Sequence, residues 1–138
     1  MSEYSKKVRS ALDVAVAAIG GQPRSGQIEM AEAVANALSD RHHLLVQAGT
    51  GTGKSLAYLI PGIVHGRKVL VATATIALQR QLVDRDLPAV VPALEKELGR
   101  EISYAIYKGV GNYICLQKMN SEDIDPDTEL VMEVSSLE

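Results

Sequence analysis

Hydrophobic residues follow two different spacings along this chain, and each spacing predicts a different kind of element. Recurrence every three or four residues predicts amphipathic helices over 5–19, 26–39, 56–64, 75–84 and 93–99. Short continuous apolar runs predict buried strands over 43–47, 68–72 and 102–107. Strands that alternate with helices in this order indicate an α/β fold, in which a mostly parallel sheet is flanked by helices.

Glycine and proline set the expected ends of these helices. Gly20 and Gly21 follow the first helix and are typical of a helix C-terminus. Pro61 lies inside the third helix and should kink or shorten it. Pro88 and Pro92 bracket an expected break before the last helix.

The composition fits one domain with an aliphatic core. The chain has 138 residues, of which 46% are hydrophobic, and it contains five Tyr but no Phe and no Trp. The formal net charge is −3 at pH 7. This charge excludes a strongly basic nucleic-acid module, so any DNA contact should be confined to a local patch.

Three features bear on where the protein works. Cys115 is the single cysteine, which argues against a disulfide framework and fits a reducing compartment. No apolar stretch approaches the roughly 20 residues that a membrane span needs. Lys6, Lys7 and Arg9 precede an apolar run, as in a secretory signal, but Asp13 interrupts that run and its helical spacing favours an amphipathic helix. We therefore expect a cytoplasmic protein with no membrane partner.

A glycine-rich turn between the first predicted strand and the third predicted helix carries the strongest chemical signal. Its residues are Ala48, Gly49, Thr50, Gly51, Thr52, Gly53, Lys54 and Ser55. The three glycines let phosphates approach the backbone closely and permit the positive φ angles that turn successive N–H groups inward. Lys54 can reach the β- and γ-phosphates, Ser55 can ligate Mg²⁺, and the N-terminus of the following helix adds partial positive charge. The turn therefore predicts a site for ATP and Mg²⁺ with Lys54 as its catalytic residue, the alternative being a purely structural turn.

This turn resembles motif I of the second helicase superfamily, and a segment before it resembles the Q motif of the same helicases. The second segment reads Pro23-Arg24-Ser25-Gly26-Gln27-Ile28-Glu29-Met30. The resemblance implies that Gln27 reads adenine, and Arg24 is expected with it in the nucleotide site. A carboxamide offers a donor and an acceptor that match adenine N7 and N6–H₂. The alternative is that Gln27 is an ordinary polar residue in the first turn of a helix.

Two later segments narrow the family. Residues 71–82 resemble motif Ia, which holds the single-strand backbone in such helicases, although Thr75 is equally an ordinary helix N-cap. Residues 107–115 closely resemble the segment that leads to the first iron–sulfur cysteine of DinG- and XPD-type helicases. All four motifs occur in the family's order, and the resemblance is strongest to the bacterial DinG branch. It implies a partial RecA-like motor domain from an ATP-dependent DNA helicase.

The resemblance also divides the chain. It implies that residues 1–116 are the N-terminal part of the first motor domain. The acidic residues 117–138 are then the start of a truncated insertion, which we expect to be solvated or disordered. If the chain is a fragment of a longer helicase, here called the parent, Cys115 is expected to be a ligand of a 4Fe–4S cluster in that parent. Such a cluster usually takes four cysteines, so it is expected only in the parent.

Groups that hydrolysis needs are missing from the sequence. The family's carboxylates come from an Asp-Glu box, and this chain contains no Asp-Glu dipeptide. We therefore expect the chain to bind nucleotide but hardly hydrolyse it, while its parent unwinds single-stranded or forked DNA. DNA binding by the chain alone should be weak and salt-sensitive, and an unfinished sheet would expose edges that allow self-association. The alternative function is a stand-alone, non-catalytic nucleotide-binding module.

Overall fold

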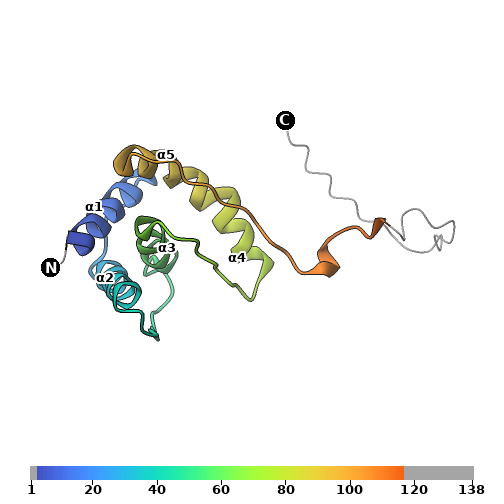
Figure 1. Ribbon diagram of the computed structural model, residues 1–138, viewed down its shortest axis with the longest axis horizontal. Coiled ribbons are helices and arrows are strands. Elements are labelled where there is room, and N and C mark those ends of the chain that lie inside the picture. Colours follow the sequence, from blue (N-terminus) through green and yellow to red (C-terminus); the bar gives the residue numbers. More distant parts are fainter. Residues whose placement is uncertain (1–2, 117–138) are drawn as a thin grey trace. The chain divides into compact units, whose positions relative to one another are not determined.

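A computed structural model describes residues 3–116, and helices dominate this part of the chain. It divides into one unit up to Ile106 and a second unit from Tyr107. The acidic segment 117–138 and the expectation attached to it lie outside the described residues. The elements in order are α1 (Glu3–Ala18), α2 (Ser25–Asp40), α3 (Lys54–His65), α4 (Ile76–Arg80), the π-helix η1 (Gln81–Asp86), α5 (Leu87–Leu98) and the 3₁₀-helix η2 (Val110–Asn112) (Figure 1).

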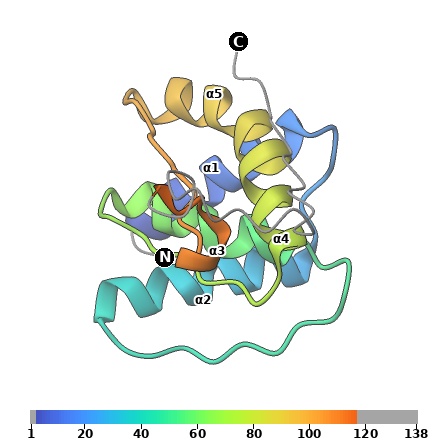
Figure 2. The same ribbon diagram turned by 90° about the vertical axis from the view of Figure 1, so that its right-hand side faces the viewer.

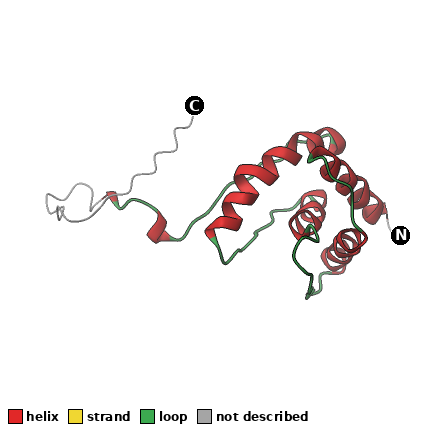
Figure 3. Cartoon of the chain, turned by 180° about the vertical axis from the view of Figure 1, so that it is seen from behind, coloured by secondary structure: helices red, strands yellow, loops and turns green. Residues whose placement is uncertain are grey.

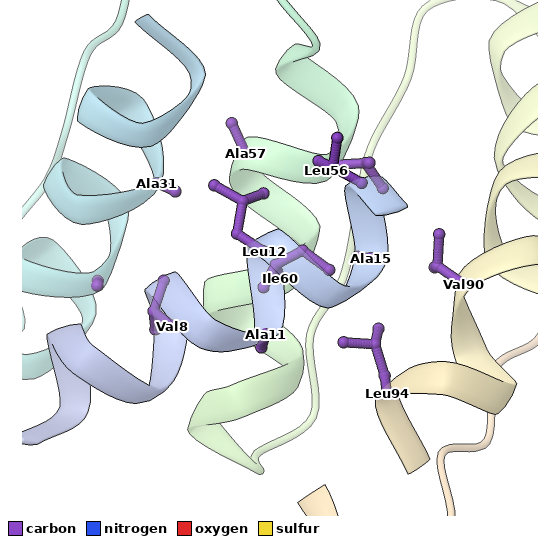
Figure 4. Close-up of a cluster of buried hydrophobic side chains, with 12 residues drawn as sticks. Val8, Ala11, Leu12, Ala15, Ala31, Leu56, Ala57, Ile60, Val90 and Leu94 are labelled. Carbon is purple, nitrogen blue, oxygen red and sulfur yellow. The ribbon is translucent and has the colours of Figure 1, made fainter. Parts of the chain in front are cut away.

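The core of the first unit forms around α1, whose apolar residues recur every three or four positions. Val8, Ala11, Leu12 and Ala15 are fully buried, as this spacing predicts. They lie in one cluster with buried side chains of α2, α3 and α5 (Figure 4). Many positions in this cluster are alanines, which allow the helix axes to approach closely.

The first helix ends where the sequence indicates. Gly20 has a φ of +72°, and the N–H of Gly21 donates to the carbonyl of Val16 at 3.0 Å. This arrangement satisfies a carbonyl at the end of α1 that no helical N–H reaches. α1 and α2 are both 16 residues long, and no helix within 3–116 is long and apolar enough to cross a membrane.

Helix α3 continues through Pro61 as a single 12-residue element. Its side chains Leu56, Leu59 and Ile60 are buried. On α1, the Tyr4 hydroxyl donates to the carbonyl oxygen of Pro61 at 2.7 Å, and burial raises the pKa of this phenol. This bond ties the first turn of α1 to the middle of α3.

The expected break between Pro88 and Pro92 is wrong, because both prolines lie inside α5. α4 leads through η1 into α5, and the N–H of Leu87 donates to the carbonyl of Leu82, five residues back. Pro88 thereby falls in the first turn of α5, where a missing N–H costs little. A sequence signal for the π-helix exists in retrospect: the apolar stripe steps by four from Leu78 to Leu82 and then by five to Leu87.

The predicted sheet is also wrong, since residues 3–116 contain no strand (Figure 3). The runs 43–47, 68–72 and 102–107 are irregular connections, and they leave Leu45 100% and Leu70 89% exposed. A strand needs a neighbour for its backbone N–H and C=O groups, and these three runs do not pair with one another. The described residues therefore form a helical assembly with exposed apolar connections. The sheet edges on which the expectation of self-association rested are not formed within them.

Candidate functional site

The glycine-rich turn connects the exposed run 43–47 to the N-terminus of α3. Gly51 has a φ of +77° and Gly53 a φ of +75°, both in the left-handed region that favours glycine. Gly53 is also the N-cap of α3, so the turn ends at the first backbone N–H groups of a 12-residue helix. These groups and the helix dipole favour an anion at this end of α3.

Lys54 folds back over the turn that precedes it. Its Nζ donates to the carbonyl of Gly49 at 2.5 Å and to the carbonyl of Ala48 at 3.2 Å. The hydroxyl of Thr52 donates to the same Gly49 carbonyl at 3.0 Å. The ammonium group thus lies over the start of the loop, where a phosphate would compete with two carbonyl dipoles for it.

The Q-motif-like segment contacts the same loop from the side of α2. Gln27 lies in the first turn of α2, is 5% exposed, and donates from Nε2 to the carbonyl of Gly53 at 3.0 Å. Arg24, the N-cap residue of α2, donates from Nη1 to the carbonyl of Gly51. α2 and α3 pack side by side, and their N-terminal ends bring the two segments together (Figure 2). Sequence reasoning placed both side chains near a nucleotide but missed that each binds a loop carbonyl.

The remaining predicted loop residues have simpler surroundings. Ser55 is the second residue of α3 and is half-buried. Thr50 and Gly49 are exposed, and a Cβ added to Gly49 would meet nothing within 4 Å. Steric crowding therefore gives no reason for a glycine at position 49. Close approach by a ligand remains the reason that the motif suggests.

Thr75 is a helix N-cap, as one of the two interpretations of the motif Ia-like segment holds. Its hydroxyl accepts a hydrogen bond from the N–H of Leu78 at 3.3 Å. The hydroxyl of Thr73 donates to the carbonyl of Thr75 at 3.1 Å. These bonds fix the entry into α4.

Cys115 lies in the second unit and is exposed. In that unit, the N–H of Lys108 donates to the hydroxyl of Tyr113 at 3.1 Å, which closes a turn around η2. Within residues 3–116, no group of three or more His, Cys, Asp or Glu side chains could hold a metal ion. One cysteine does not fit a four-cysteine cluster.

Comparisons with known proteins agree with the motifs. The DEAD/DEAH box helicase family model matches residues 8–121. The chain is 56% identical over 126 residues to the ATP-dependent helicase DinG of Mycobacterium tuberculosis, a match that covers 88% of this chain and 19% of that protein. It is 39% identical over 121 residues to the ATP-dependent DNA helicase YoaA of Haemophilus influenzae, covering 86% of this chain and 18% of the relative.

A third relative carries a different name. The chain is 34% identical over 119 residues to the 3'-5' exonuclease DinG of Bacillus subtilis, covering 80% of this chain and 12% of that protein. No solved structure matches the chain significantly. The chain therefore spans less than a fifth of the length of these curated relatives.

Proposed function

The chain belongs to the DEAD/DEAH box helicase family, and on this premise we propose that it binds ATP with Mg²⁺ at the loop 48–55. The observation that carries the proposal is the position of Lys54, whose ammonium lies over the loop within 2.5 Å of the Gly49 carbonyl. A phosphate at the N-terminus of α3 would meet this cation, the loop N–H groups and the positive end of the helix together.

Each residue then has a separate task. Lys54 would neutralise charge on the β- and γ-phosphates, and the Ser55 hydroxyl would help to hold the Mg²⁺ ion, which would offset further phosphate charge. The glycines at 49, 51 and 53 leave the backbone open to the phosphate oxygens. Thr50 and Thr52 contribute their N–H groups.

Gln27 is proposed to contact the adenine. Its Nε2 already donates one hydrogen to Gly53, which leaves the second N–H and the Oε1 acceptor for a base. That pair matches the N7 and N6–H₂ edge of adenine. The Gln27 side chain would then contact both the adenine base and the loop.

We propose that the longer protein is an ATP-dependent DNA helicase acting on single-stranded or forked DNA, and that this chain alone hardly hydrolyses ATP. The sequence contains no Asp-Glu dipeptide to hold Mg²⁺ and orient the attacking water. DNA binding by this chain alone should be weak, because its net charge is −3. A role for Cys115 as an iron–sulfur ligand is confined to a longer protein that supplies further ligands.

An exonuclease is the second candidate, because the Bacillus subtilis relative is named as one. That match covers 12% of the relative, and the described residues of this chain hold no acidic cluster for catalytic metals. The helicase proposal is therefore favoured for the segment that the two proteins share.

Calorimetric titration of ADP with Mg²⁺ into the chain tests the proposal. We expect binding at one site with a dissociation constant of about 1 μM to 1 mM, the range in which the KM values of most enzymes lie. Heat of dilution alone, at concentrations well above this range, would reject nucleotide binding by this chain. Phosphate release from ATP distinguishes the helicase fragment, which should show almost none, from a complete small ATPase.

Replacing Gly53 by alanine should weaken Mg²⁺–ADP binding by about tenfold. The φ of +75° costs a residue with a side chain about 1–2 kcal/mol. The new Cβ would also lie 2.9 Å from Cδ of Gln27 and displace that side chain. The loop would relax away from its present conformation, so a smaller fraction of molecules would be competent to bind.

Gly26→Ala is the matched control for this change. Gly26 lies in the first turn of α2, has no positive φ, and a Cβ there meets nothing within 4 Å. The same titration on both variants separates the effect of the loop conformation at Gly53 from the general effect of adding a methyl group. Equal affinities for the two variants would show that the conformation at Gly53 does not matter for binding.

A further inference from the structure

The carbonyl oxygens of Gly51 and Gly53 are held by side chains from outside the loop. Arg24 Nη1 donates to Gly51, and Gln27 Nε2 donates to Gly53 at 3.0 Å. The Gly53 carbonyl also accepts the N–H of Ala57 at 3.2 Å as the first helical bond of α3. Gly51 lies in the middle of the turn, outside α3, so Arg24 holds a peptide that no helical bond fixes.

The planarity of the peptide bond gives this contact a consequence for the loop. The carbonyl of Gly51 and the N–H of Thr52 belong to one rigid trans unit and point in opposite directions. A guanidinium that fixes the carbonyl on the α2 side therefore aims the Thr52 N–H away from α2. An arginine fixes one direction well, because its planar donor group is charged and rigid.

We propose that Arg24 is a positioning residue for the phosphate-binding loop: it orients the Gly51–Thr52 peptide and does not itself touch the nucleotide. The inference rests on the proposed function, because it assigns Arg24 a task in the same site. It differs from the expectation drawn from the Q motif, which placed Arg24 among the residues that contact the nucleotide.

The location of Arg24 supports this division of tasks. Arg24 is the N-cap residue of α2 with an extended backbone, φ −101° and ψ 147°, and its bond to the Gly51 carbonyl places its side chain beside the loop. A Cβ built on Gly51 would lie 4.0 Å from Arg24 Nη1, in ordinary contact. The guanidinium thus lies beside Gly51, with its Nη1 engaged by the carbonyl of that residue.

Binding of Mg²⁺–ATP and of Mg²⁺–tripolyphosphate, which has no base, tests the proposal in this chain and in Arg24→Met. We expect the variant to lose about 10-fold to 100-fold in affinity for both ligands, as the loss of one charged hydrogen bond implies. Arg24→Lys, which keeps a charged donor, should recover part of the loss. Arg9→Met is the control, since Arg9 pairs with Glu32 at 3.5 Å and ties α1 to α2 without reaching the loop.

A second readout separates positioning from direct contact with phosphate. Amide spectra of the chain without any ligand should show a shifted Thr52 N–H resonance in Arg24→Met, and no such shift in Arg9→Met. Equal thermal unfolding midpoints of the two methionine variants would show that the fold is intact.

The other outcomes each overturn the inference in a recognisable way. If Arg24→Met loses affinity for ATP but not for tripolyphosphate, Arg24 contacts the base. Equal loss for both ligands with an unchanged Thr52 amide would mean that Arg24 contacts the phosphates directly. If Arg24→Met keeps full affinity for both ligands, Arg24 has no role in nucleotide binding. If the unmodified chain binds neither ligand, the proposed function itself fails, and this inference fails with it.

Discussion

Replacing Lys54 by alanine should lower the affinity of the chain for Mg²⁺–ADP by about 10-fold to 100-fold. The Nζ of Lys54 lies over the loop, bonded to the carbonyls of Ala48 and Gly49. When phosphates bind, these bonds to neutral carbonyls are exchanged for bonds to phosphate oxygens, in which both partners are charged; a hydrogen bond to a charged group is worth about 1.5–3 kcal/mol. Alanine removes this exchange, and calorimetric titration measures the loss directly.

Lys96→Ala provides the control for the loss of one positive charge, because Lys96 is exposed on α5 and far along the chain from the loop. Its affinity should equal that of the unmodified chain. If both lysine variants bind ADP equally well, Lys54 does not contact the phosphates and the loop is a structural turn. This outcome would remove the main support for the proposed nucleotide site.

Leu12→Ala should destabilise the first unit by about 2–5 kcal/mol, the usual effect of deleting a buried leucine side chain. Leu12 is fully buried at the centre of the cluster in Figure 4, with Val8 and Ala15 on the same helix and side chains from three others around it. Small domains are stable by only about 5–15 kcal/mol, so this is a large share of the total. Urea denaturation gives the free energy of unfolding of both proteins.

The chain contains its own control for this change. Leu45 is 100% exposed, so Leu45→Ala removes the same atoms without opening a cavity. This substitution should change the free energy of unfolding by no more than about 0.5 kcal/mol, as is usual for surface positions. A similar loss of unfolding free energy in Leu12→Ala and Leu45→Ala would contradict the burial of Leu12 in the core. α1 would then not be the element around which the unit packs.

The helices could be predicted because their signal is local. The expected ranges 5–19 and 26–39 correspond to Glu3–Ala18 and Ser25–Asp40, since an apolar stripe of helical period and the residues at its ends suffice to define each helix. The expected strands failed for the opposite reason. A short apolar run such as 68–72 is compatible with a strand, but a strand forms only with a neighbour, and the run itself does not specify one.

The candidate site was predictable in part for similar reasons. Glycines and a lysine in a fixed spacing identify the loop, because phosphate binding constrains those residue types. The contact of Arg24 with Gly51 could not be predicted, since the acceptor is a backbone carbonyl, which every residue possesses. Only the packing of α2 against α3 selects that carbonyl.

The π-helix η1 has a consequence for how the chain tolerates changes in length. The five-residue step from Leu82 to Leu87 shows that one residue is accommodated there in excess of a regular α-helix. Deleting Val83 would restore the four-residue step and keep Val90 and Leu94 facing α1. The same deletion placed inside α5 would rotate every later side chain by about 100° around the helix axis. We therefore expect this chain to tolerate a one-residue deletion better within Gln81–Asp86 than inside α5.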